Sequence, residues 1–326
     1  MRYVDTLTIS DEKYPMQLRN ILNPPKVLYC EGDISLLSKP SVTVIGSRNM
    51  SEYGNIMARN ITRDLTKNNI CIVSGMAVGI DAVAHKTCIE NNGKTIAVLG
   101  SGFDHVFPKE NKGLFKKIIS SGGCVISEYA PDTVAQKRFF PERNRIVSGL
   151  SRGTVVVEAT YRSGTSITAH YALDQGKKVF CVPNCVGSKN SAGIINMLKK
   201  GAIIATTGSD ILYELGWLQK SEFSENFEQT QEKKKLQKIE ILEQEELKNL
   251  DEQAKQIYFY IKENKIVNPE VISNELKMSI QKMNVYLTIL ELKGLIINKS
   301  GVNYSIREEL YVWKTESRKW RGMFSL

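Results

Sequence analysis

Short apolar segments recur between residues 41 and 217, and helical patterns separate most of them. The segments cover residues 42–45, 70–73, 95–99, 124–126, 154–157, 178–182 and 202–205. Apolar strands that alternate with helices of about 10–15 residues are typical of βαβ units, which form a parallel sheet with helices on both faces. Ligands of such sheets bind beyond the carboxyl ends of the strands. The sequence therefore predicts an α/β, extended Rossmann-like domain whose site lies in the loops that follow the strands.

Composition divides the chain into further parts on either side of that domain. The expected parts are a lead-in at 1–37, the Rossmann-like domain at 38–218, a charged linker at 219–250, a winged-helix domain at 251–308 and a tail at 309–326. The lead-in contains Pro24 and Pro25, which prevent a long helix, and it is too short to bury a core of its own. We therefore expect it to pack on the domain that follows.

The expected winged-helix domain follows a linker that is rich in Glu, Lys and Gln and contains neither Gly nor Pro. Three helical patterns and two short strand patterns then succeed one another, which is typical of a winged helix-turn-helix. The helix that would enter a DNA groove carries Lys282 and Lys293 as its cations. Groove reading in duplex DNA and contact with a protein both stay open for this domain. The basic, aromatic tail receives no role.

The positive charge of the chain is concentrated in the Rossmann-like domain. The 326 residues include 44 basic and 35 acidic residues, which gives a net charge of +9. Residues 38–217 contain 22 of the basic and 13 of the acidic residues, a difference that equals the whole excess. A basic excess confined to one folded domain suggests a polyanionic partner, although a generally basic proteome would produce it too.

Membrane and metal signals are weak in this sequence. No apolar run reaches the roughly 18–20 residues that span a bilayer, and the acidic N-terminus lacks the pattern of a signal peptide. We therefore expect a cytoplasmic protein without a membrane partner. The six cysteines lie mainly at apolar strands, and the three histidines lack the spacing of a metal site. Reduced thiols, no metal and no cofactor are expected.

Glycine-rich turns follow four of the expected strands. In the first turn, Gly46-Ser47-Arg48, free N–H groups and the dipole of the next helix would attract an anion, and Arg48 adds donors suited to a phosphate. An ordinary βα turn with a solvated arginine is the alternative. The other turns contain Gly75, Gly79, Gly100 and Gly102, and the segment Ser163-Gly164-Thr165-Ser166. None of them is a Walker loop or a complete dinucleotide fingerprint.

The segment Lys137–Arg145 combines four cations with two adjacent rings, Phe139 and Phe140. Cations can follow the phosphates of a single strand while a ring stacks on a base. In the alternative interpretation one ring belongs to the core, and the arginines pair with carboxylates of the same domain. Those carboxylates would be Glu128, Glu142 or Glu158.

Taken in order, these motifs resemble those of the DNA-processing protein A family (DprA, also called Smf). The matching stretches include Gly46-Ser47-Arg48, Ser74-Gly75-Met76-Ala77, Leu99-Gly100-Ser101-Gly102, Pro108-x-Glu110-Asn111, Phe140-Pro141-x-Arg143-Asn144-Arg145 and Ser163-Gly164-Thr165. The resemblance covers about residues 10–217 densely and the winged-helix end more loosely. It implies a non-catalytic protein that binds single-stranded DNA, forms a homodimer and helps to load the recombinase RecA during natural transformation.

The resemblance also implies roles for single residues. By the family's pattern Gly46, Ser47 and Arg48 hold a backbone phosphate, whereas Lys137 and Phe140 supply charge and base stacking. The full set of expected DNA-binding residues is Gly46, Ser47, Arg48, Lys137, Phe140, Arg143, Asn144, Arg145, Ser163, Gly164, Thr165 and Ser166. Gly75, Gly79, Gly100 and Gly102 are secondary candidates. Dimerisation is implied for residues 191–205, where Ile194, Ile195 and Leu198 form an apolar face.

An enzyme that acts on a nucleotide is the alternative function. The segment Gly153–Glu158 is similar to the Gly-Thr-x-x-Glu stretch of nucleotide phosphoribohydrolases, in which the glutamate works on a ribosyl bond. Glu158 would then be catalytic. The basic segment Lys137–Arg145 exceeds what a mononucleotide needs, which favours the DNA-binding interpretation.

Overall fold

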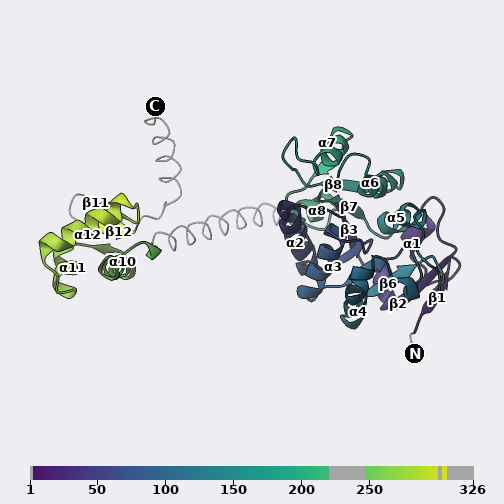
Figure 1. The fold of residues 1–326 in the computed structure, drawn as a ribbon, viewed down its shortest axis with the longest axis horizontal. Helices are drawn as coiled ribbons and strands as arrows, with labels where there is room; N and C mark the ends of the chain where they lie inside the picture. Colours follow the sequence, from purple (N-terminus) through teal and green to yellow (C-terminus); the bar gives the residue numbers. More distant parts are fainter. Residues whose placement is uncertain (1–2, 220–246, 300–302, 307–326) are drawn as a thin grey trace. The chain divides into compact units, whose positions relative to one another are not determined.

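The computed structural model describes residues 3–219, 247–299 and 303–306, which fall into two compact units (Figure 1). The first unit lies within Met1–Ser224 and the second within Glu225–Leu326. Each unit buries hydrophobic side chains of its own. Among the helices of the described ranges, none combines the length and the apolar character needed to cross a membrane.

A nine-stranded sheet forms the centre of the first unit. Its strands are β1 (Asp5–Thr8), β2 (Val27–Gly32), β3 (Ser41–Ile45), β4 (Cys71–Ser74), β5 (Thr95–Val98), β6 (Cys124–Ser127), β7 (Gly153–Val156), β8 (Lys178–Cys181) and β9 (Ile203–Ile204). They lie in the order β1-β2-β6-β5-β4-β3-β7-β8-β9. The pairs from β6 through β9 are parallel. The mostly parallel α/β sheet predicted from the sequence is confirmed.

The N-terminal residues extend this sheet. β2 pairs antiparallel with β6, and β1 pairs antiparallel with β2. The short helix α1 (Met16–Arg19) lies between these two strands in the chain and buries Leu18 completely. The lead-in therefore adds two strands at one edge of the sheet, which its apolar pattern did not predict.

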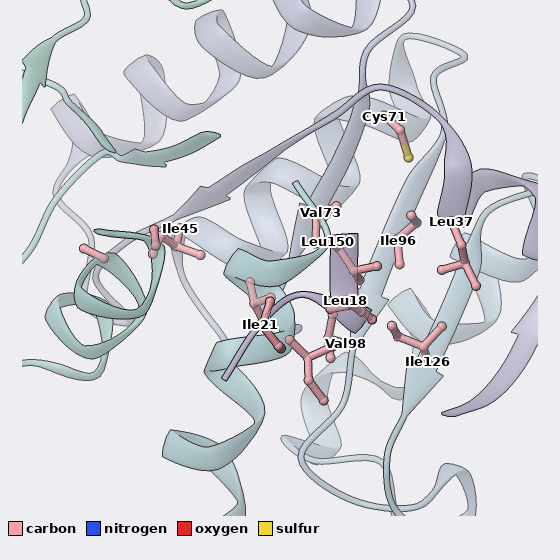
Figure 2. Close-up of a cluster of buried hydrophobic side chains, with 14 of the residues drawn as sticks. Leu18, Ile21, Leu37, Ile45, Cys71, Val73, Ile96, Val98, Ile126 and Leu150 are labelled. Atoms are coloured by element: carbon pink, nitrogen blue, oxygen red, sulfur yellow. The ribbon is translucent and has the colours of Figure 1, made fainter. Parts of the chain in front are cut away.

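Helices cover both faces of the sheet. One face carries α1, α5 (Phe139–Gly149), α6 (Gly164–Asp174) and α7 (Ala192–Lys199). The other face carries α2 (Glu52–Lys67), α3 (Ile80–Glu90), α4 (Lys112–Ser120) and α8 (Gly208–Glu214). In Figure 2, Leu18 and Leu150 lie over Val98 and Ile126 of the sheet. All five residues of β3 are buried because this central strand has helices on both sides.

Local sequence explains where the helices nearest the predicted site begin. Ser51 is the N-cap of α2, since its Oγ accepts a hydrogen bond from the N–H of Gly54 at 3.0 Å. Ser163 caps α6 in the same way through the N–H of Ser166 at 3.3 Å. α5 begins at Phe139, so both phenylalanines lie in its first turn.

The second unit contains the helices α10 (Glu252–Asn264), α11 (Pro269–Glu275) and α12 (Ile280–Leu292). Its sheet has the order β10 (Ile266–Val267), β12 (Asn303–Ile306) and β11 (Ile296–Lys299), with antiparallel pairs. Helices with a small sheet are what the winged-helix pattern predicted. The strand β10 was not predicted, because two residues are too few to show a period. The predicted tail at 309–326 and most of the predicted linker lie outside the described residues.

Candidate functional site

A cavity of about 1270 Å³ opens at the carboxyl ends of the parallel strands. The loops after β3, β4, β5, β7 and β8 line it, together with residues of the segment that follows β6. We call this hollow the rim cavity. Its position is the one that a mostly parallel sheet favours for ligands. Ten of the expected DNA-binding residues line the rim cavity, namely Gly46, Ser47, Arg48, Lys137, Phe140, Arg143, Asn144, Ser163, Gly164 and Thr165. Arg145 and Ser166 do not line it.

The turn Gly46-Ser47-Arg48 presents its backbone to the rim cavity. Gly46 is buried, and a Cβ there would lie 2.7 Å from the Ile80 side chain. The Thr165 hydroxyl donates to the Gly46 carbonyl at 3.0 Å and so joins this turn to the loop after β7. Within the described residues, no acceptor takes the N–H of Ser47 or Arg48. These N–H groups and the exposed Arg48 side chain can therefore receive an anion.

Gly79 fixes the position of that turn from the other side. Its φ of +81° is unfavourable for a residue with a side chain, and a Cβ would collide with the carbonyl oxygens of Ser47 and Arg48. The N–H of Ile80 donates to the Ser47 carbonyl at 3.2 Å. Gly79 therefore supports the turn without lining the rim cavity. Gly75 does line it.

Two buried charged side chains, Arg143 and Asp81, lie behind the turns. The Arg143 side chain is 5% exposed, and it donates to the carbonyls of Gly75, at 2.7 Å, and Val98. One Asp81 carboxylate oxygen accepts the N–H groups of Gly75 at 3.1 Å and Ala77 at 3.4 Å. Burial raises the pKa of Asp81 to about 6 and lowers the pKa of Arg143 to about 10, so the guanidinium stays charged at neutral pH. Arg143 holds the ends of β4 and β5 in place, which the sequence did not reveal.

The Arg145 side chain forms an ion pair with Glu128. Its two terminal nitrogens contact the two Glu128 carboxylate oxygens at 2.8 and 2.6 Å, and its Nε donates to the Asn23 carbonyl at 2.8 Å. Its side chain does not reach the rim cavity. The alternative in which arginines of this segment pair with carboxylates therefore holds for Arg145. Its assignment to the DNA-binding residues stays a prediction.

The two adjacent phenylalanines have separate environments. Phe139 is buried and stacks on Tyr129, with ring centroids 4.0 Å apart. Phe140 is half-buried and lines the rim cavity, and the centroids of the Phe140 and Phe107 rings are 5.4 Å apart. Phe107 is 47% exposed and was missed by the sequence analysis, since one aromatic residue in a loop gives no periodic signal. Lys137, just before α5, is exposed at the edge of the same cavity.

The turn before α6 closes the rim cavity on the side of β7. The Asn144 side-chain amide donates to the Gly164 carbonyl at 3.2 Å, which joins α5 to this turn. A Cβ at Gly164 would meet nothing within 4 Å, so the backbone here is open to a ligand. Ser166 instead turns its hydroxyl toward the Thr160 carbonyl at 3.4 Å. Gly100 and Gly102 allow close packing against Phe140 and against the Ala130 carbonyl.

Glu158, the catalytic candidate of the alternative function, is completely buried. Its carboxylate accepts hydrogen bonds from the Ser51 N–H at 2.9 Å, the Ser51 hydroxyl at 2.5 Å, Asn190 at 3.0 Å and Asn184 at 3.4 Å. It does not line the rim cavity. In this structure Glu158 ties the start of α2 to the loop after β8.

The expected dimer residues lie on α7. Ile194 is fully buried in the subunit core, so its side chain is not available to a partner in this structure. Ile195 and Leu198 are half-buried, and Leu198 packs against the same core. In the part of the chain that the structure covers, no three His, Cys, Asp or Glu side chains are grouped so that they could hold a metal ion.

The fold and the site define an α/β protein with an anion-receptive cavity at the carboxyl edge of its sheet. The family model for DNA recombination-mediator protein A matches residues 5–216. The chain belongs to this family. The matched residues end before the second unit begins.

Individual relatives agree with the family match. The DNA processing protein DprA of Bacillus subtilis (strain 168) is 39% identical over 213 residues, which is 65% of this chain and 71% of that protein. The DprA of Streptococcus pneumoniae (strain ATCC BAA-255 / R6) is 41% identical over 209 residues, or 64% and 73% of the two chains.

Two solved structures resemble the first unit. The X-ray structure of DprA from Streptococcus pneumoniae has a TM-score of 0.62 at 40% identity and covers 64% of this chain and 74% of that chain. A DprA structure from Helicobacter pylori has a TM-score of 0.59 at 30% identity and covers 66% and 98% of the two chains. The Helicobacter pylori structure gives insight into a single-stranded DNA binding mode of that protein.

Proposed function

We propose that this chain is a non-catalytic single-stranded-DNA-binding protein of the cytoplasm. It would protect incoming DNA and help to load the RecA recombinase in natural transformation and homologous recombination. The observation that carries the proposal is the rim cavity, which gathers Arg48, Lys137 and Phe140 beside the free N–H groups of the Gly46 turn. Membership of the family and the single-stranded DNA binding described for the Helicobacter pylori relative support it.

The size and chemistry of the rim cavity favour a polymer over a small ligand. Pockets for small molecules usually measure about 300–1,000 Å³, and the rim cavity measures about 1270 Å³. Arg48 and Lys137 supply positive charge, and the half-buried Phe140 offers a ring on which a base can stack. In our proposal Ser47 and Arg48 hold a phosphate, while Asn144 and Thr165 border its path.

The remaining parts of the proposal concern domains and partners. We assign DNA binding to residues 38–218 and leave the winged-helix domain at 251–308 outside the DNA path. A homodimer through residues 191–205 would use Ile195, whereas Ile194 stays in the subunit core. RecA is expected to assemble faster on single-stranded DNA that this chain has bound. The rate of RecA assembly on such DNA, with and without this chain, measures that effect.

The nucleotide-cleaving alternative requires a carboxylate that can reach a ribosyl bond. Glu158 is buried, and each of its oxygens accepts hydrogen bonds from the protein, so both are engaged in holding the fold. Incubation with nucleoside monophosphates is expected to release no free base. Release of base that Glu158→Gln abolishes would establish the enzyme instead.

Titration of labelled oligonucleotides tests the proposal directly. The wild-type chain is expected to prefer single-stranded over double-stranded DNA, with an affinity that falls steeply as salt rises. The Arg48→Ala/Lys137→Ala variant should lose about 3–6 kcal/mol of binding free energy, since charged hydrogen bonds contribute about 1.5–3 kcal/mol each. Lys39→Ala/Lys67→Ala removes the same charge at the amino ends of β3 and β4 and serves as the control. Equal affinity of both double variants would contradict the proposal.

A further inference from the structure

A ridge of lysines leads away from one end of the rim cavity. A smaller recess of about 320 Å³ shares Arg48, Phe107 and Phe140 with the rim cavity, and Lys109 lines this recess. Lys109 begins the short 3-10 turn Lys109–Asn111 that leads into α4, on which Lys112 and Lys116 are exposed. Lys109, Lys112 and Lys116 form what we call the α4 ridge.

The geometry of α4 places these lysines on its outer side. Leu114, Phe115 and Ile118 are buried against the sheet unit, and Lys112 and Lys116 are one helical turn apart on the opposite side. A Cβ at Gly113 would meet nothing within 4 Å, so none of the described residues packs on the helix surface at this position. The rise of about 1.5 Å per residue separates Lys112 and Lys116 by about 6 Å along the helix.

The charges of the α4 ridge are not neutralised by the described residues. Other cations of the unit have carboxylate partners, as in the pairs Arg59–Glu90 and Lys178–Glu214. No carboxylate of the described residues lies within ion-pair distance of Lys109, Lys112 or Lys116. Between residues 109 and 117, Glu110 is the one acid beside four lysines.

This arrangement reduces the stability of α4 when no anion is bound. Like charges one turn apart destabilise a helix slightly, and a cation in the first turn opposes the helix dipole. Lys112 is the first residue of α4, whose first turn contains no acid. An anion along the ridge relieves both effects. A polyanion that already occupies the adjoining cavity is the ligand that fits this ridge.

We propose that single-stranded DNA leaves the rim cavity past Phe107 and continues along the α4 ridge, where Lys109, Lys112 and Lys116 contact successive phosphates. This inference rests on the proposed function and extends its binding path. The contacts are to the backbone, so they carry no sequence preference. They contribute only to strands long enough to reach beyond the rim cavity.

Oligonucleotides of increasing length, bound to the full chain, test this path. Lys112→Ala/Lys116→Ala is compared with Lys39→Ala/Lys67→Ala, which removes two lysines at the opposite edge of the sheet. Alanine favours a helix at least as well as lysine, so α4 is expected to fold in the variant. The Lys112→Ala/Lys116→Ala variant should have wild-type affinity for the shortest oligonucleotides that the wild-type chain binds. Its affinity for longer oligonucleotides should be about tenfold lower at low salt. With long strands, the slope of log affinity against log salt concentration should become shallower by about 1.4, which is about 0.7 for each lost phosphate contact.

Two results would overturn the ridge. One is equal binding by both double variants at every length, and the other is a loss that is as large for the shortest strands as for long ones. The proposed function is tested separately by Arg48→Ala/Lys137→Ala with the shortest strands. Wild-type affinity of that variant would refute DNA binding in the rim cavity. A negative result for the α4 ridge leaves DNA binding in the rim cavity unaffected.

Discussion

The rim of the sheet and the outer side of α12 are two surfaces of opposite chemistry. At the rim, glycine turns, free N–H groups and unpaired cations surround a cavity, and buried charges hold the turns from behind. On α12, Val285 and Leu292 are 58% and 73% exposed on the side opposite to the buried Met283 and Leu287. Exposed apolar side chains give phosphates little to bind, so we expect nucleic-acid affinity in the first unit. The following predictions test that difference.

The largest expected effect comes from removing the buried Arg143 side chain behind the rim. Arg143→Met leaves the carbonyls of Gly75 and Val98 without this donor and removes a nearby positive charge from the buried Asp81, which together should cost about 3–5 kcal/mol of unfolding free energy. Denaturant unfolding followed separately for the two units should show the loss in the first unit alone. The variant could instead fold with wild-type stability while the slope of its log affinity against log salt concentration falls by the value of one phosphate contact. Arg143 would then be a direct DNA ligand.

The adjacent rings of α5 offer a matched pair of variants. Phe140→Ala should weaken binding of single-stranded DNA by about 1–3 kcal/mol with little change in stability, because this ring is the one that faces the rim cavity. Phe139→Ala should destabilise the first unit, since its ring is buried against Tyr129. Anisotropy titrations and thermal unfolding of both variants measure the contrast. Reversed effects would show that the stacking ring is Phe139.

Two buried groups beneath the rim predict opposite pH effects on stability. Burial and the nearby Arg143 charge lower the pKa of His85 to about 3, so the stability that neutral His85 contributes is present above pH 6.5 and lost as the pH falls. Burial raises the pKa of Asp81 to about 6 from 3.8. The stability that protonated Asp81 contributes to the folded chain therefore grows as the pH falls from 6 toward 4. Each effect can reach about 1.4 kcal/mol per pH unit, and the two oppose each other.

Single variants separate these effects. Relative to wild type, His85→Asn should become more stable as the pH falls from 6 to 4.5, and Asp81→Asn should become less stable. Denaturant unfolding at several pH values provides the measurement. The second unit contains none of the three histidines, so its unfolding serves as an internal control. Parallel profiles of wild type and His85→Asn would show that His85 is protonated in the folded chain.

The smallest effect is expected from the second unit. Removal of the residues after 219 should change the affinity for single-stranded DNA by less than about twofold, because the rim cavity and the α4 ridge lie in the first unit. The same titration with Lys282→Ala/Lys293→Ala in the full chain should give an equally small change. A tenfold loss in either case would place part of the DNA path on the winged-helix side.

Patterns that depend on neighbouring residues were predictable from the sequence. The alternation of apolar strands and helices gave the parallel sheet, and the rule that ligands lie at carboxyl ends located the rim. The Ser51 N-cap of α2 is a pattern of this kind, because capping needs only a hydroxyl at the start of a helix. The antiparallel strand β1 was not predicted, since its partner β2 lies beyond two prolines and a short helix.

Chain order and strand period place particular residue types at the carboxyl edge of the sheet, so these could be predicted from the amino-acid sequence. The role of each residue depends on how the chain folds around it. Arg48, Arg143 and Arg145 carry the same guanidinium, yet one is exposed, one holds strand ends from within and one pairs with Glu128. The physical reason is that burial and partners come from segments distant in the chain. A cation is free for a ligand only where folding leaves it near water and away from a carboxylate.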